Sequence, residues 1–367
     1  MNGDSGTNAL DVLVIGGGQA GLATGYHLDQ RGLSYQIVDA GDEVGQTWAS
    51  RWDSLRLFTS RPYDDLPGVT FPVGATPYPS KDEVASYLRS YADRFHLQVR
   101  LKTEVTSLRR SDGVYLAETG DETLVARNVV VATGAFQAPL TPRAATQLDA
   151  GVFQLHSLGY RRPAAIPPGR VLVVGAGNTG CQIALELSAT HSVELAVGAR
   201  IPTVPQRPFG RDIWSWATAI RLDKITVESR MGRRLAGRDQ IIGTGPRKLA
   251  RRHGVALRPR ITGASGRQIS FADGSAGSYE AIVWATGFRT DHTWIDIGGV
   301  LDQHGTLRQS RGVTASPGLY TVGQAWQHTR GSALLGWVGD DAAFIADHIL
   351  ATTPERRPLG IGRQGSP

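Results

Sequence analysis

The sequence predicts an α/β fold built from two dinucleotide-binding, Rossmann-like units. Three observations support this prediction. An apolar run followed by Gly-x-Gly-x-x-Gly occurs at 12–21, the same arrangement returns at 171–180, and an apolar strand ending in Ala-Thr-Gly follows each of them, at 129–134 and 282–287. Such apolar runs are typical of parallel strands buried on both faces. Each glycine-rich turn is typical of a site that holds one dinucleotide.

The first unit shows the full context of such a site. Residues 13–15 predict a buried strand, and a helix is expected from Ala20 to about Gln30. The glycines would make the tight turn, admit a pyrophosphate and let helix and strand pack closely, while the helix N-terminus attracts the phosphates. A strand at 35–38 ends in Asp39, whose carboxylate can hold the ribose hydroxyls. The alternative, a glycine-rich turn in an ordinary α/β protein, does not account for this context. The expected binding residues of the turn are Gly16, Gly18, Gln19, Ala20 and Gly21.

The second unit repeats the pattern, with a helix expected at 181–187 and a strand at 193–197. Two units in one chain suggest that electrons pass between a nicotinamide and a flavin. Arg200, just after the strand, favours NADPH because a guanidinium suits the 2′-phosphate. The alternative for Arg200 is a surface position in an arginine-rich chain. The expected binding residues of this turn are Gly175, Gly177, Asn178, Thr179 and Gly180.

Composition narrows the class of protein. The 367 residues carry a net charge of +6, but no nucleic-acid-binding motif accompanies the arginines at 200–260, so no nucleic-acid partner is expected. No apolar run approaches the ~20 residues of a membrane span, and the first residues lack a signal pattern, so a cytoplasmic protein is expected. Cys181 is the only cysteine, which excludes a redox-active cysteine pair within the chain. No metal-binding cluster is visible.

Other elements follow from local patterns. Ser80 and Glu83 form a capping box that starts a helix over 80–95. A last helix is expected at about 340–350, and the tail from Pro354 is predicted to be disordered. Short strands are expected at 97–101, 105–108 and 114–117.

The residues after Asp39 resemble the flavin-containing monooxygenase superfamily. Gly45, Thr47 and Trp48 match its Gly-x-x-Trp element, which lies along FAD in that family, and Arg51 follows. The similarity is strongest to the small bacterial branch that also resembles plant indole-3-pyruvate monooxygenases. Further positions that this resemblance assigns to cofactor binding are Val105, the connector residues Ala132, Thr133, Gly134, Thr286 and Gly287, and the closing residues Gly323 and Gln324.

Two positions depart from the family pattern. Animal members have an Asn before a Thr-Ser-basic stretch, and Phe58 stands at that position before Thr59. The group that would hydrogen-bond the oxygenated flavin is therefore not evident. His156 and Tyr160 match the superfamily fingerprint only in part, and Arg161 replaces the proline usual in Baeyer–Villiger members. We interpret His156 as an anchor of the domain linker, not as a catalyst.

The resemblance implies a flavoprotein with FAD and NADPH as cofactors. The FAD domain would comprise 1–160 and 290–367, with the NADPH domain, 161–289, inserted. NADPH would reduce FAD, and reaction with O₂ would give a flavin C4a-hydroperoxide that oxygenates a small-molecule substrate at nitrogen, sulfur or a carbonyl. No catalytic side chain is assigned, and a homodimer is left open. The alternatives are an NADPH-dependent flavin reductase that passes electrons to a quinone or partner protein, and a flavin-bearing, transport-associated regulatory subunit.

Overall fold

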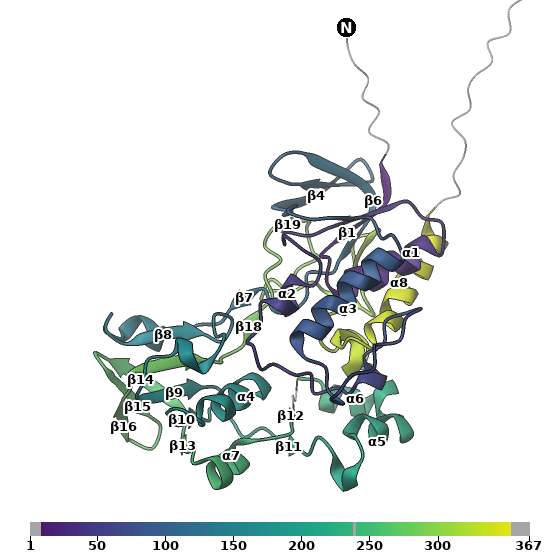
Figure 1. The fold of residues 1–367 in the computed structure, drawn as a ribbon. Coiled ribbons are helices and arrows are strands. Elements are labelled where there is room, and N and C mark those ends of the chain that lie inside the picture. The colour runs from purple at the N-terminus through teal and green to yellow at the C-terminus, as the bar shows by residue number, and fades with distance from the viewer. Residues whose placement is uncertain (1–8, 238–239, 354–367) are drawn as a thin grey trace, which may run out of the picture.

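The computed structural model describes residues 9–237 and 240–353. They form two principal sheets with flanking helices, joined side by side, and three smaller sheets (Figure 1). The α/β, two-unit fold expected from the sequence is confirmed. The tail from Pro354 lies outside the described residues.

The first sheet centres on β1, which is parallel to β2 on one side and to β6 on the other. β6 starts two branches of the sheet. In one branch β5 pairs antiparallel with β6 and β4 pairs antiparallel with β5, and in the other β22 pairs parallel with β6. Its main path is β19 (Ile295–Asp296), β4 (Ser107–Ser111), β5 (Val114–Glu118), β6 (Thr123–Val131), β1 (Leu10–Ile15), β2 (Tyr35–Val38) and β3 (Val99–Arg100). The branch is β22 (Leu319–Thr321), β21 (Val313–Thr314) and β20 (Gln309–Ser310).

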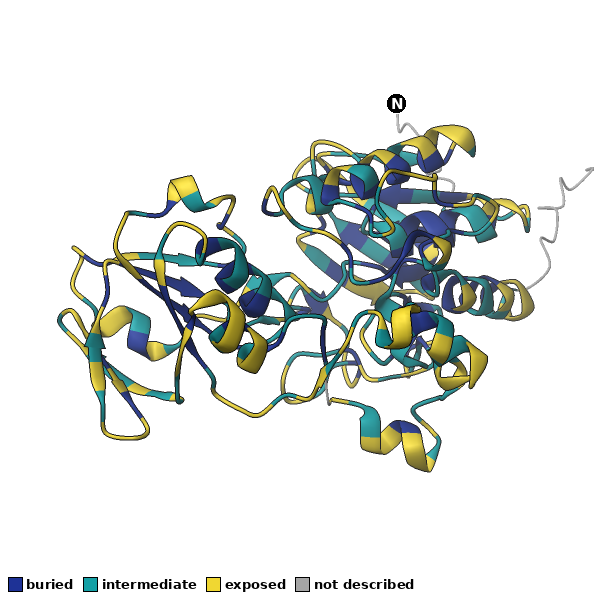
Figure 2. Ribbon diagram, turned by 60° about the horizontal axis from the view of Figure 1, so that its bottom comes forward, coloured by how far each residue is buried: buried dark blue, intermediate teal, exposed yellow. Residues whose placement is uncertain are grey.

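Helices cover one face of this sheet. They are α1 (Gln19–Asp29), α3 (Lys81–Arg94) and α8 (Val338–Thr352), which lie together in Figure 1. Because side chains alternate along a strand, Val12 and Val14 join the core beneath these helices, while Leu13 and Ile15 join a core on the other face. Both faces of β1 are thus buried, as the unbroken apolar run predicts (Figure 2).

The second sheet is entirely parallel. Its order is β13 (Ala256–Arg258), β10 (Ser192–Ala196), β9 (Arg170–Val174), β17 (Ala281–Trp284) and β8 (Phe153–His156). Val171 and Val173 pack toward α4 (Asn178–Leu187) and α7 (Pro246–His253). Leu172 and Val174 pack on the opposite face. That face is covered by β14 (Ile261–Ser265), β15 (Gln268–Phe271) and β16 (Ala276–Ser278).

Two chain crossings join the sheets. They pair with each other as β7 (Ala138–Pro139) and β18 (Phe288–Arg289), which run antiparallel. β8 follows β7 and pairs with β17 of the second sheet. The predicted domain boundaries at 160 and 289 stay predictions.

An irregular segment follows the second sheet's β10 and returns against the first domain. It is closed by pairing of β11 (Thr203–Val204) with β12 (Ile241–Ile242). The segment includes α5 (Ile213–Ala219) and α6 (Arg230–Leu235), which Figure 1 shows near α8. Val227 N donates to His328 O, which ties this segment to the loop before α8. The short 3₁₀ turns of the chain are η1 (Arg61–Tyr63), η2 (Arg143–Gln147), η3 (Pro163–Ala165), η4 (Pro208–Gly210), η5 (Leu222–Lys224) and η6 (Arg330–Ala333).

Most local expectations are confirmed. The capping box of α3 is present in full, and the last helix lies two residues beyond the expected bounds at each end. The strand expected at 97–101 is wrong in length, because Leu97 N caps the end of α3 by donating to Ala92 O and only 99–100 pair with β2. Among the described residues no helix is long and apolar enough to cross a bilayer, and none of their His, Cys, Asp and Glu side chains cluster as a metal site would require.

Candidate cofactor sites

The glycines of the first turn have three separable roles. Gly16 has a φ of 113°, and a Cβ there would lie 2.5 Å from Ala132 O. A Cβ on Gly21 would lie 1.8 Å from Gly16 O, so only glycine lets α1 pack against this turn. A Cβ on Gly18 would meet none of the described atoms within 4 Å. Gly18 therefore faces open space at the N-terminus of α1, where the backbone can approach a ligand.

The second turn has the same design. Cβ atoms on Gly175 and Gly180 would lie 2.2 Å from Ala285 O and 1.8 Å from Gly175 O, respectively. Gly177, like Gly18, has open space within the described part of the chain. Gly18 and Gly177 are also the N-caps of α1 and α4 and offer no capping side chain. The first N–H groups of both helices are therefore available to a phosphate.

Asp39 is held beside the first turn by two backbone hydrogen bonds. Gly17 N donates to Asp39 Oδ2 at 2.5 Å and Gly41 N donates to Oδ1 at 2.7 Å. These bonds fix the carboxylate at the end of β2, and each oxygen keeps a lone pair for a ribose hydroxyl. Val105 lies buried in the segment between β3 and β4.

Gln19 links the first turn to two other segments. Trp48 Nε1 donates to Gln19 Oε1 at 3.2 Å, and Gln19 Nε2 donates to Ala333 O at 3.5 Å. Trp48 belongs to the short helix α2 (Gln46–Ala49), whose N-cap is Gly45. Gly45 has a φ of 83° and lies against α3, so this position excludes a side chain. Ala20 contacts Gly323, whose Cβ would lie 2.7 Å from that of Ala20. The structure thus brings the Gly-x-x-Trp element, the first turn and the closing segment together.

The closing segment leaves one buried donor unused. Gln324 Nε2 is buried and makes no hydrogen bond to the described residues. An unpaired buried amide is costly unless a ligand completes it. Together with the open space at Gly18, this donor fits a bound dinucleotide.

The Ala-Thr-Gly connectors are tied to each other at the domain junction. Gln137 Nε2 donates to Thr133 Oγ1 at 2.6 Å, and Thr286 Oγ1 donates to Leu140 O at 2.5 Å. Gly134 and Gly287 have φ values of 71° and 87°, which favour glycine. Ala132, which precedes these residues, is the partner that Gly16 approaches.

His156 forms a hydrogen bond to the second connector. This contact agrees with its interpretation as an anchor of the domain linker. Leu158 N donates to Nδ1 at 3.1 Å, so the ring proton lies on Nε2, which donates to Gly287 O at 3.0 Å. Burial lowers the pKa of His156 and keeps the ring neutral. Arg51 lies at the same junction, with its guanidinium 5.1 Å from the Phe136 ring centre. The expected role of Arg51 in FAD binding stays a prediction.

A cavity of about 1310 Å³ lies beside the second turn, between α4, the end of β10 and the start of α7. The exposed Arg200 lines it. Asn178 also lines it, but the side chain is engaged: Oδ1 accepts from Ile242 N at 2.8 Å and Nδ2 donates to Gln240 O at 3.1 Å. Asn178 therefore holds β12 against α4. Sequence reasoning missed Arg247 and Lys248, two exposed cations of α7 that line the same cavity.

The buried carboxylate of Glu194 pairs with one of the arginines that line this cavity. Arg258 lines the cavity, yet its Nε donates to Glu194 Oε2 at 2.6 Å. Arg170 and Tyr279 bind the same carboxylate, at 2.7 Å each. Burial opposes ionisation of Glu194, but these hydrogen bonds outweigh it and lower the pKa to about 2. With Arg258 paired to Glu194, the cations left to face an anionic ligand are Arg200, Arg207 and the two of α7.

Aromatic side chains from distant segments meet beside the first domain. Phe58 stacks on Trp214 at 6.3 Å, and Trp214 meets Trp337 at 5.0 Å. Trp214 is 4% exposed, so its side chain packs inside the protein and does not line an open passage to solvent. Next to this cluster, Thr59 Oγ1 donates to the fully buried Asp64 at 2.5 Å. Burial raises the pKa of Asp64 to about 7. No sequence pattern pointed to this carboxyl.

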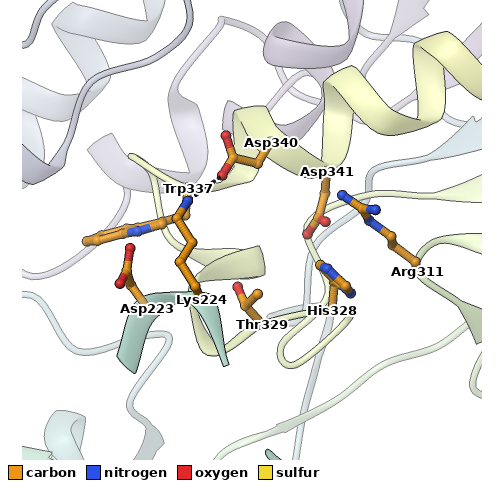
Figure 3. Close-up of a pocket in the computed structure, with 8 residues that line it drawn as sticks. All are labelled: Asp223, Lys224, Arg311, His328, Thr329, Trp337, Asp340 and Asp341. Atoms are coloured by element: carbon orange, nitrogen blue, oxygen red, sulfur yellow. Dashed lines mark hydrogen bonds and ion pairs between the residues drawn. The ribbon is translucent and has the colours of Figure 1, made fainter. Parts of the chain in front are cut away.

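The loop before α8 borders a small polar cavity of about 160 Å³ (Figure 3). Arg311, His328 and Asp341 lie on one side of it, and the ion pair of Lys224 with Asp340, 3.3 Å long, lies on the other. Asp223 of η5 completes the wall.

These observations describe two similar glycine-rich turns, one in each of the two principal sheets. Residues 13–207, more than half of the chain, match the pyridine nucleotide-disulphide oxidoreductases. The chain belongs to this family. An uncharacterized CzcO-like oxidoreductase of Geobacillus kaustophilus is 42% identical over 93% of this chain and 98% of its own.

Monooxygenases of the same family align over nearly the whole chain. A probable indole-3-pyruvate monooxygenase of Arabidopsis thaliana is 26% identical over 92% of this chain and 89% of its own. The structure of a flavin-containing monooxygenase from Stenotrophomonas maltophilia is 29% identical, covers 94% of this chain and 98% of its own, and superposes with a TM-score of 0.79. The resemblance to the flavin-containing monooxygenase superfamily is therefore confirmed, and so is the pairing of a flavin with a pyridine nucleotide as the family's cofactors.

Proposed function

We propose that this flavin-dependent oxidoreductase is an NADPH-dependent monooxygenase that transfers one atom of O₂ to nitrogen, sulfur or a carbonyl of a small molecule. The observation that supports it best is the pair of open glycine turns in a chain 29% identical, over 94% of its length, to a flavin-containing monooxygenase. FAD, once reduced by NADPH, would supply the activation of oxygen.

The chain's own residues would bind and orient the cofactors. Gly18 and the first N–H groups of α1 would take the FAD pyrophosphate, and Asp39 would take the ribose. Gln324 would use its free amide on the flavin side. Around the second turn, Gly177 would admit the NADPH pyrophosphate and Arg200 its 2′-phosphate. The neutral His156 would keep the connector at Gly287 fixed between the two sites.

One structural feature argues against the disulfide chemistry in the family's name. Cys181 is the only cysteine of the sequence and is 1% exposed. Burial raises its pKa to about 12, so the thiolate needed for exchange is not formed near neutral pH. A reductase that delivers electrons to a quinone or a partner protein remains the second candidate. The cytoplasmic location, the homodimer and the residue-level domain boundaries stay predictions.

Stoichiometry tests the proposal. The purified holoprotein is given NADPH with a panel of amines, thioethers and 2-oxo acids, and NADPH oxidation, O₂ consumption and product mass are followed. A monooxygenase consumes one O₂ for each NADPH and gives a product that gains oxygen. If no compound gains oxygen and a quinone alone accelerates NADPH oxidation, the reductase is the correct assignment.

A further inference from the structure

An exposed apolar surface lies on the segment that contains η4, α5 and η5. Phe209 is 95% exposed, Ile220 65%, Leu222 43% and Trp216 37%. The rings of Phe209 and Trp216 meet edge to face at 6.4 Å. We call these four residues the apolar tip. Contiguous exposed apolar patches rimmed by polar residues mark interaction sites.

The geometry of α5 separates an inner face from this tip. Residues 214 and 216 are two positions apart and so point to opposite sides of a helix. Trp214 packs inward against Phe58 and Trp337. Trp216 and Ile220 are four apart and share the outer side. The inner face accounts for folding, whereas the outer face contributes little to it.

Phe209 adds a second sign of function. Its φ of 53° lies in the left-handed region, which bulky residues rarely adopt. A residue whose ring is 95% exposed gains little packing energy to offset that strain. Residues held in such conformations cluster at functional sites.

Cations outnumber acids in the segment around the tip. Residues 207–234 include three acids, and two of them, Asp212 and Glu228, are paired within the protein. Asp212 accepts from Tyr78 Oη at 2.9 Å, Asp223 lines the polar cavity of Figure 3, and Glu228 faces His328 at 3.7 Å. The same stretch contains the cations Arg207, Arg211, Arg221, Lys224, Arg230, Arg233 and Arg234.

Several of these cations are free to bind an anion. The side chains of Arg211 and Arg221 are exposed, and neither guanidinium group makes a hydrogen bond or ion pair with another described residue. Arg211 lies two residues after Phe209, and Arg221 lies between Ile220 and Leu222. Unpaired guanidinium groups therefore alternate with the apolar side chains of the tip.

We propose that the apolar tip docks on the surface of an anionic lipid bilayer. Apolar and aromatic side chains would enter the headgroup region, while Arg211 and Arg221 would bind lipid phosphates. Four side chains fall well short of the ~1,000 Å² that a specific protein interface needs, whereas a bilayer accepts a small wedge whose affinity comes partly from charge. The docking does not depend on the proposed function.

Vesicle sedimentation tests the docking directly. The holoprotein is mixed at low salt with vesicles of phosphatidylglycerol and phosphatidylcholine in equal parts, or of phosphatidylcholine alone, and the pelleted fraction is measured. Binding is expected only to the anionic vesicles and should weaken as salt is raised. Phe209→Ser should weaken binding about tenfold, and Arg211→Gln or Arg221→Gln about fivefold each.

Val73→Ser is the matched control, because Val73 is 97% exposed but lies outside the tip. It should bind as the wild type does, and circular dichroism checks that every variant folds. The proposal is overturned if the wild type does not pellet, if both vesicles bind equally, or if Phe209→Ser binds normally. Self-association that Phe209→Ser abolishes, without vesicle binding, would assign the tip to a second copy of the chain instead.

Discussion

Gly18→Val separates cofactor binding from folding more cleanly than any other change in the first turn. Gly18 has φ −76° and ψ −172°, an extended conformation that valine adopts readily. The added side chain would meet no described atom within 4 Å of its Cβ. At Gly16 or Gly21 the new Cβ would overlap backbone oxygens at 2.5 and 1.8 Å, so those variants would not test binding.

The expected loss follows from the contacts that the new side chain blocks. Valine at the N-cap of α1 would hold the pyrophosphate away from the free N–H groups of the first turn. Each charge-assisted hydrogen bond contributes about 1.5–3 kcal/mol, so losing two costs about 3–6 kcal/mol. At 1.4 kcal/mol per tenfold change, the FAD Kd should rise by about 10²–10⁴. The stability of the apoprotein should change by no more than about 1 kcal/mol.

Titration of apoprotein with FAD, followed by flavin fluorescence quenching, measures the Kd, and thermal unfolding measures stability. Gly120→Val is the matched control, because Gly120 also has open space in the described structure and lies on the surface, far from the turn in sequence. Gly177→Val should keep FAD but lose reduction by NADPH. A folded Gly18→Val protein whose FAD Kd stays within about threefold of the wild type would refute the assignment of this turn.

Three further predictions address the cofactor, the reaction and stability. Arg200→Ala should raise the NADPH Kd by about tenfold or more while leaving NADH nearly unchanged; an equal effect on both donors would remove Arg200 from the 2′-phosphate site. Phe58→Asn should lower the hydrogen peroxide released per NADPH oxidised, since an amide would then be available beside the flavin, and unchanged release would contradict that placement. Glu194 has its pKa lowered from 4.5 to about 2, so it stabilises the fold by about 3 kcal/mol above pH 4.5 and loses this as the pH falls toward 2. Glu194→Gln should therefore lower stability at pH 7 and flatten its decline in acid, as chemical denaturation at several pH values would show; a slope equal to that of the wild type would contradict the linkage.

Local patterns in the sequence were sufficient to predict the elements whose conformation depends on neighbouring residues in the chain. The strand–turn–helix units, the capping box of α3 and the paired Ala-Thr-Gly connectors follow from apolar periodicity and from glycine's freedom at φ values such as that of Gly16. The same spacing located Asp39, and the family resemblance extended this to Trp48 and Gln324; the fold brings all three around the first turn or its closing segment.

Only the tertiary structure decided which of those residues are free to bind. Asn178 belongs to the expected segment, but its side-chain amide is engaged by the backbone of Gln240 and Ile242. The same dependence on distant contacts hid Asp64, whose raised pKa comes from burial rather than from its neighbours in sequence. Sequence spacing places a side chain on a strand or turn. Whether that side chain is satisfied, buried or exposed depends on segments that fold back from far along the chain.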